Sequence, residues 1–285
     1  MKQAKENTMQ LFYKVCRACS KVTTESYSSS FSSAIRLLHT DLQMPVHNIY
    51  GFVRFADEIV DTFHNYDKVS LLKEFRHETF AAIERGISLN PILQSFQETV
   101  NKYGITHDLI KAFFTSMEMD LERTSYNENG YATYIYGSAE VVGLMCLHIF
   151  CDGNEDEYYR LKPYACSLGA AFQKVNFLRD MKADYNDLKR VYFPGCDFSN
   201  FSSPDKAVIE EDIQRDFDRA FEGIIQLPLK ARFGVYVAYK YYLSLFKKIK
   251  RLQPQMIMET RIRIPDYGKA LILAKASVRS KLNLL

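Results

Sequence analysis

Apolar residues recur three or four positions apart along nearly the whole chain of 285 residues, which is the spacing of helices that each bury one face. No alternating run of apolar and polar residues persists beyond about five residues, so the pattern does not favour strands. No repeat, low-complexity tract or linker divides the chain. The sequence therefore predicts a single all-α domain over residues 1–285 with roughly ten helices, in which residues 1–20 form a peripheral N-terminal helix.

Proline and small polar residues indicate where helices begin and end. Expected helix starts are Pro45 as the first helical residue, Asn90-Pro91 and Ser203-Pro204. Expected loops cover 125–131, 151–156 and 193–204.

Composition excludes several classes of protein. Net charge is +3 with a pI near 8.4, and no block of Lys and Arg is long enough to indicate a nucleic-acid partner. The longest apolar run, residues 141–151, is well short of the roughly 20 residues that span a bilayer. No signal peptide is recognised at the start of the sequence. Six cysteines are scattered, and the C-x-x-C of Cys16 and Cys19 has no second pair to complete a zinc site, so reduced thiols and a cytoplasmic location are expected.

One predicted helix, YGFVRFADEIVDTF (residues 50–63), carries charges in an otherwise apolar sequence. At 100° per residue, Tyr50, Arg54, Asp57 and Asp61 share an arc of about 60°. Glu58 lies further round. The two aspartates are one turn apart, about 6 Å along the axis, and like charges at this spacing repel each other unless a cation lies between them.

A second predicted helix repeats the arrangement in QKVNFLRDMKADYNDLKRVYFP (residues 173–194). Gln173, Asn176, Asp180 and Asp184 share an arc of about 80°, with Arg179 beside it. A single D-x-x-x-D face is most often solvated. Two such faces, each in an apolar helix and each with an arginine shortly before its first aspartate, indicate instead that the faces meet in one cavity.

Four carboxylates in one cavity require cations. Mg²⁺ binds one or two carboxylates together with substrate phosphates, and arginines bind phosphate directly. The two faces therefore predict a site for Mg²⁺ and a diphosphate inside a helical fold.

These two stretches resemble the aspartate-rich motifs of the phytoene/squalene synthase family, the head-to-head prenyl transferases, and the resemblance extends from about residue 27 to about residue 281. The second motif, Q-x-x-N-x-x-R-D-x-x-x-D followed by R-x-Y-F-P, is the more specific one. DEIVD is closest to the first motif of phytoene synthases. The resemblance implies an all-α, isoprenoid synthase-type bundle around a central apolar cavity.

The resemblance also implies roles for individual residues. Implied catalytic residues are Asp57, Asp61, Asp180, Asp184, Arg54 and Tyr134. Implied metal ligands are Asp57, Asp61, Asn176, Asp180 and Asp184. Implied substrate-binding residues are Ser28, Ser30, Phe31, Tyr50, Ala139, Gly143, Gln173, Asn176, Arg179, Tyr242 and Arg261. The chain departs from the family at Tyr27, Ser29 and Glu140, where His, a basic residue and Gly are usual.

The implied reaction is head-to-head condensation of two prenyl diphosphates, with Mg²⁺ as cofactor and Mn²⁺ as its substitute. The leading interpretation joins two geranylgeranyl diphosphates to phytoene, a step of carotenoid biosynthesis, through a cyclopropyl diphosphate and with release of diphosphate. One alternative is a C30 synthase that makes dehydrosqualene or squalene from farnesyl diphosphate, and only the squalene branch needs NADPH. An alternative of another class is a non-catalytic helical assembly factor that retains the fold.

The expected location is cytoplasmic with peripheral membrane contact, because substrate and product are both apolar. The basic amphipathic stretch at 242–252 is the candidate membrane surface. The oligomeric state is left open.

Overall fold

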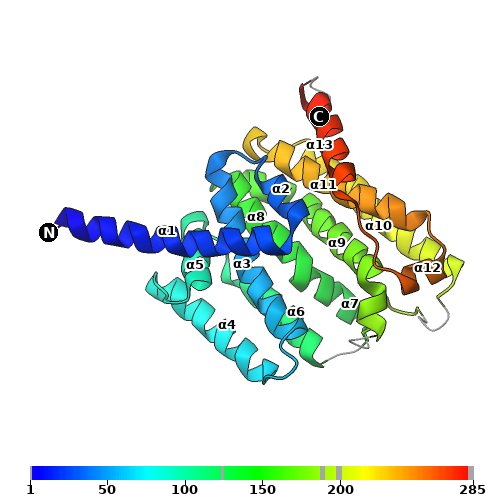
Figure 1. The fold of residues 1–285 in the computed structure, drawn as a ribbon, viewed down its shortest axis with the longest axis horizontal. Coiled ribbons are helices and arrows are strands. Elements are labelled where there is room, and N and C mark those ends of the chain that lie inside the picture. The colour runs from blue at the N-terminus through cyan, green and yellow to red at the C-terminus, as the bar shows by residue number, and fades with distance from the viewer. Residues whose placement is uncertain (1, 123–124, 187–189, 197–200, 282–285) are drawn as a thin grey trace.

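The computed structural model describes residues 2–122, 125–186, 190–196 and 201–281, with side chains except at 2–7, 183–186, 266 and 280–281 (Figure 1). In these residues the chain forms thirteen α-helices and one π-helical segment, and only an isolated bridge between Ser125 and Val191 has strand pairing. The prediction of an all-α fold is therefore confirmed.

The elements are, in chain order, α1 (Lys2–Tyr27), α2 (Ser29–Ile35), α3 (Thr40–Asp61), α4 (Lys68–Arg85), α5 (Pro91–Tyr103), α6 (His107–Glu122), α7 (Glu128–Ile135), the π-helix η1 (Tyr136–Glu140), α8 (Val141–Cys151), α9 (Glu155–Asn186), α10 (Ser203–Ile224), α11 (Leu229–Lys250), α12 (Pro254–Glu259) and α13 (Asp266–Lys281).

Two of the three predicted helix starts agree with the structure. Asn90 caps α5, because its Oδ1 accepts a hydrogen bond from the amide of Ile92 at 3.1 Å. Ser202 and Asp205 form a capping box at the start of α10, so this helix begins at Ser203 as expected. The predicted loop at 125–131 ends early, since α7 begins at Glu128.

Pro45 was wrongly assigned as a first helical residue. The helix α3 begins five residues earlier, at Thr40, and Pro45 lies inside it. His39 supplies the cap, as its Nδ1 accepts from the amide of Asp41 at 3.5 Å. Inside a helix a proline loses one backbone hydrogen bond and its ring crowds the carbonyl four residues earlier, which costs about 3 kcal/mol. The apolar face that the rest of α3 buries offsets this cost.

The helix α1 is joined to the bundle through its second half. Cys16, Ser20 and Thr24 are buried where α1 packs against α3 and α5, whereas its first half extends away from the other helices (Figure 1). The cysteines are all free thiols, in agreement with the expected reduced state.

The helix α8 is apolar on nearly every side, with His148 as its one polar side chain. Residues Glu128–Cys151 are long and apolar enough to cross a membrane by length and composition. In the bundle, Val141, Leu144 and Met145 on α8 are buried in the core, while Gly143 and Cys146 line a cavity. One face of α8 packs in the core and the other lines the apolar cavity. Burial inside the bundle therefore explains why this helix is apolar, without a membrane.

Candidate active site

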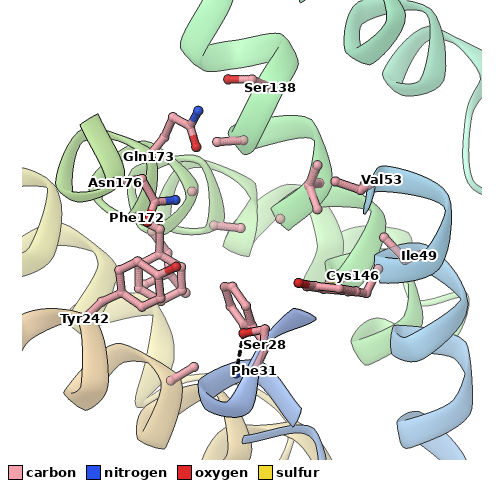
Figure 2. A pocket seen from close by; sticks show the side chains of 18 of the residues that line it. Ser28, Phe31, Ile49, Val53, Ser138, Cys146, Phe172, Gln173, Asn176 and Tyr242 are labelled. Carbon is pink, nitrogen blue, oxygen red and sulfur yellow. Dashed lines mark hydrogen bonds between the residues drawn. The ribbon is translucent and has the colours of Figure 1, made fainter. Parts of the chain in front are cut away.

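A single cavity of about 630 Å³ lies between α2, α3, α8, α9 and α11. Figure 2 shows Ile49 and Val53 of α3 on one wall, Gln173 and Asn176 of α9 on the other, and Phe31 of α2 between them. Carboxylates and arginines line the cavity together with a larger number of aliphatic and aromatic side chains. The predicted residues that line it are Ser28, Phe31, Tyr50, Arg54, Asp57, Asp61, Tyr134, Ala139, Gly143, Gln173, Asn176, Arg179, Asp180, Tyr242 and Arg261.

The polar face of α3 is turned into the cavity. Tyr50, Arg54, Asp57 and Asp61 all line it, while the opposite face of the helix is in the core, with Phe52 fully buried. Burial raises the pKa of Asp57 to about 8, and the neighbouring charge of Asp61 contributes to the same shift. The helical spacing of these charges therefore puts like charges together inside the protein.

Arg54 does not pair with either aspartate of its own face. Its guanidinium forms an ion pair with Glu58 and lies 4.3 Å above the ring of Tyr27, which itself lines the cavity. One aromatic and one acidic neighbour, Tyr27 and Glu58, hold this cation at the cavity wall. Tyr27, one of the departures from the family pattern, thus has a defined partner.

The polar face of α9 approaches from the other wall. Asp180 accepts from Arg179 Nε at 3.1 Å and forms an ion pair with Arg261 Nε at 2.8 Å. The Oδ1 atom of Asn176 is buried and has no hydrogen-bond partner, which leaves an oxygen acceptor free for a ligand. The side chain of Asp184 lies outside the described residues.

A largely buried network beside the first aspartate face includes three cavity-lining residues that the sequence analysis did not single out, Asp120, Arg190 and Tyr192. Asp120 on α6 accepts hydrogen bonds from the hydroxyls of Tyr134 at 2.6 Å, Tyr126 at 3.2 Å and Tyr192 at 3.4 Å. Arg190 donates to Asp61 at 2.9 Å and to the main-chain oxygen of Asp120 at 3.0 Å. Asp120 thereby connects Tyr134 to the aspartate face of α3 through Arg190.

No sequence signal marks Asp120 as special. It sits among Met117, Met119 and Glu118, where a lone acid is normally solvated. Burial raises its pKa to about 6, although the charge of Arg190 acts in the opposite direction. Arg190 and Tyr192 belong to the R-x-Y-F-P stretch that the sequence analysis quoted, but it assigned neither of them to the site.

Aromatic rings meet beside the polar part of the cavity. Phe172 and Tyr242 are stacked with centroids 3.9 Å apart, and Phe31 lies 5.6 Å from Tyr242. Ser28 caps α2 by accepting from the amide of Phe31 at 3.2 Å, which fixes the position of this ring. Aromatic faces of this kind stabilise a cation and exclude water.

Small residues set the wall formed by η1 and α8. A Cβ on Gly169 of α9 would lie 2.8 Å from the main-chain oxygen of Ala139, so α9 and η1 cross in direct backbone contact. Glu140, the second departure from the family, lies behind this wall and does not line the cavity. Burial raises its pKa, while a hydrogen bond with Cys166 opposes the shift.

Two expectations about the N-terminal serine segment are not met. Ser30 lies on α2 but does not line the cavity. Ser28 and Phe31, which are three residues apart and so lie on the same side of the helix, are the residues here that face the cavity. Ser29 is exposed, and its Oγ accepts a hydrogen bond from Lys269 Nζ at 2.7 Å. The missing basic side chain at position 29 is therefore matched by a lysine from α13.

The donor set suits a hard divalent cation. Asp57, Asp61, Asp180 and the free oxygen of Asn176 all present oxygen to the same cavity, which are the ligands that Mg²⁺ takes. Among the described side chains, no three acidic, His or Cys residues lie close enough to form a complete metal site. The remaining ligands would have to come from phosphate, water or the second aspartate of α9.

The fold and the cavity define an all-α prenyl transferase. The family model for squalene/phytoene synthase matches residues 24–267. The chain therefore belongs to the squalene/phytoene synthase family, whose members condense prenyl diphosphates head to head.

Individual relatives cover most of the chain. It is 24% identical to a phytoene synthase of Arthrospira platensis over 294 residues, which covers 94% of this chain and 93% of the relative. It is 26% identical to a 4,4'-diapophytoene synthase of Staphylococcus haemolyticus (strain JCSC1435), which covers 74% of this chain and 70% of the relative. A solved dehydrosqualene synthase in complex with a ligand shares the fold, with a TM-score of 0.80 at 18% identity over 94% of this chain and 98% of that structure.

Proposed function

We propose that the protein joins two geranylgeranyl diphosphates to phytoene. The observation that carries this proposal is that the α3 and α9 aspartate faces both line one cavity whose other lining residues are mostly apolar. The relationship to phytoene synthases along nearly the full chain supports the same substrate class. The two polar faces suit diphosphate groups, and the aliphatic remainder suits their hydrocarbon chains.

Mg²⁺, when bound, would neutralise the charge that grows on the departing diphosphate. Asp57 and Asp61 on α3 and Asp180 with Asn176 on α9 would hold it. Arg179 and Arg261 lie at Asp180 and are placed to bind phosphate oxygens.

The apolar walls keep water from the cation that ionisation produces. The rings of Phe31, Phe172 and Tyr242 stabilise its positive charge. Attack by the double bond of a second substrate gives a tertiary cation, which closes to the cyclopropyl diphosphate as it loses a proton to the released diphosphate. A second ionisation releases the other diphosphate, and rearrangement with loss of a second proton gives the triene at the centre of phytoene.

A C30 synthase is the second candidate, because a diapophytoene synthase is among the relatives and a dehydrosqualene synthase shares the fold. The two candidates differ in the length of hydrocarbon that the apolar part of the cavity accepts.

The test is incubation of the purified protein with Mg²⁺ and either geranylgeranyl or farnesyl diphosphate, followed by identification of the hydrocarbon. Phytoene from the C20 substrate is expected. Dehydrosqualene from the C15 substrate alone would favour the second candidate, and squalene formed only with NADPH would indicate the reducing branch. Absence of diphosphate release from both substrates, with Mg²⁺ or with Mn²⁺, would favour a non-catalytic assembly factor.

A further inference from the structure

The membrane surface expected from the sequence is not available in the fold. In the stretch 242–252 the apolar side chains Tyr242, Leu245, Phe246 and Ile249 are buried in the core. The exposed residues of this stretch are Lys247, Lys248, Lys250 and Arg251. The amphipathic pattern there reflects packing of α11 inside the bundle, so a membrane contact must use another surface.

The outer face of α13 carries an exposed apolar stripe. Tyr267, Leu271 and Val278 are 80%, 56% and 57% exposed, and Ala274 between them is exposed too. Their spacing of four, three and four residues aligns them along one side of the helix. On the other side Ala276 is buried. The helix is thus apolar on the face that packs on the bundle and again on the face that does not.

The charges around this stripe have one sign. Residues 267–279 contain Lys269, Lys275 and Arg279 and no Asp or Glu. Lys240 of α11 lies close enough to Arg279 for the two charges to repel, and burial together with this repulsion lowers the pKa of Lys240. A second copy of this surface would bring like charges together, whereas an anionic lipid surface would neutralise them.

The helix α13 is anchored close to residues that line the cavity. Arg261, which lines the cavity, lies five residues before the start of α13 at Asp266. In addition, Nζ of Lys269 in α13 donates a hydrogen bond to the hydroxyl oxygen of Ser29 at 2.7 Å. Ser29 is the neighbour of Ser28, which lines the cavity. A membrane that binds α13 would therefore lie near the cavity-lining residues Arg261 and Ser28.

We propose that the outer face of α13 docks on an anionic lipid bilayer, with the stripe of Tyr267, Leu271, Ala274 and Val278 among the headgroups and with Lys275 and Arg279 on lipid phosphates. The link between this docking and catalysis rests on the proposed function. A protein that takes prenyl diphosphates and makes a C40 hydrocarbon would take its substrates from the bilayer and release its product into it. The docking itself is a property of the surface and can be measured without turnover.

The test is co-sedimentation with vesicles of phosphatidylglycerol and phosphatidylcholine, compared with vesicles of phosphatidylcholine alone. The intact protein should bind the anionic vesicles, and high salt should weaken binding because it screens the lysines and arginine. The double substitution Leu271→Glu/Val278→Glu should lower the partition coefficient at least roughly tenfold.

The matched control is Leu89→Glu/Val208→Glu, which adds the same charge at side chains that are 93% and 70% exposed on other elements. This variant should bind the vesicles much as the intact protein does. Circular dichroism melts of both variants check that they fold, and turnover in detergent micelles reports the proposed function separately from lipid binding.

Equal loss of binding in the two double variants would overturn the assignment to α13, as would no binding of the intact protein to anionic vesicles. If light scattering shows a dimer that Leu271→Glu/Val278→Glu converts to a monomer, with vesicle binding unchanged, the stripe is an interface between copies and not a lipid surface.

Discussion

The buried carboxylate of Asp120 offers the sharpest test of how the site is held together. We expect Asp120→Asn to lower both stability and turnover, because Asp120 lines the cavity and also anchors Tyr134 and Arg190. Asparagine keeps the shape and one acceptor oxygen, but it removes the negative charge and adds an amide that cannot accept from a tyrosine hydroxyl. The variant therefore perturbs the network without opening a cavity.

The magnitude follows from the contacts that change. The bond from Tyr134 at 2.6 Å loses its charged acceptor, and hydrogen bonds to charged groups contribute about 1.5–3 kcal/mol. Arg190 loses one buried acidic neighbour at 3.9 Å but keeps Asp61 at 2.9 Å, so the full cost of about 3–5 kcal/mol for breaking a buried pair is not reached. A destabilisation of about 2–4 kcal/mol is expected, which is roughly 4–16 °C in Tm.

The assays are a thermal melt and steady-state kinetics with prenyl diphosphate. Because Arg190 and Tyr134 lose a shared anchor, kcat should fall by at least roughly tenfold, about 1.4 kcal/mol of barrier. Tyr126→Phe is the control, since it removes only the longer hydrogen bond to the same carboxylate and should lose less of both quantities. An Asp120→Asn variant with unchanged Tm and unchanged kcat would show that the network does not position the site.

Three other outcomes follow from the structure. Without added metal, Asp57→Asn should keep or raise Tm because burial and the neighbouring Asp61 make the ionised form of this carboxyl group unfavourable. Asp180→Asn should lower Tm because it removes the carboxylate that pairs with two arginines. Both substitutions should abolish turnover, and near-full activity of either variant in a product assay would refute the site. Burial lowers the pKa of His47 to about 4, below an unfolded value of about 6.5. The unfolded state then binds more protons between these values, so the free energy of unfolding should fall by about 2 kcal/mol from pH 7 to pH 5, and urea melts of His47→Gln should lack this component. Gly169→Ala should be about 1–3 kcal/mol less stable in a denaturant melt, since its Cβ would meet backbone at 2.8 Å; an equal effect of Gly143→Ala, where the nearest atom is at 3.2 Å, would refute the close-crossing argument.

The sequence was sufficient to predict the two polar faces because helical geometry alone fixes them. Once a segment is helical, Tyr50, Arg54, Asp57 and Asp61 must point the same way, whatever the rest of the chain does. That the faces on α3 and α9 meet in one cavity needed an energetic argument, namely that apolar helices do not bury carboxylates singly. The structure places both faces at the same cavity.

Asp120 could not be predicted in this way, because burial of a single acid depends on which helices cover it. Its partners Tyr126, Tyr134 and Arg190 come from later segments of the chain, and nothing in the local sequence specifies their approach. The same limit explains the misplaced membrane surface. Amphipathic spacing at 242–252 shows that a face will be covered, but only the fold shows that α11 covers it with protein and that the apolar stripe of α13 has no cover.

The ion pairs of the site also explain how one cavity tolerates carboxylates on two walls. Asp61 pairs with Arg190 at 2.9 Å and Asp180 pairs with Arg261 at 2.8 Å, so each already has a cation. Asp57 has no ion pair within 4 Å among the described residues, and burial beside Asp61 raises its pKa to about 8. A divalent cation that enters this cavity would therefore displace the proton that the raised pKa of Asp57 favours, and it would supply the counter-charge that this carboxylate lacks.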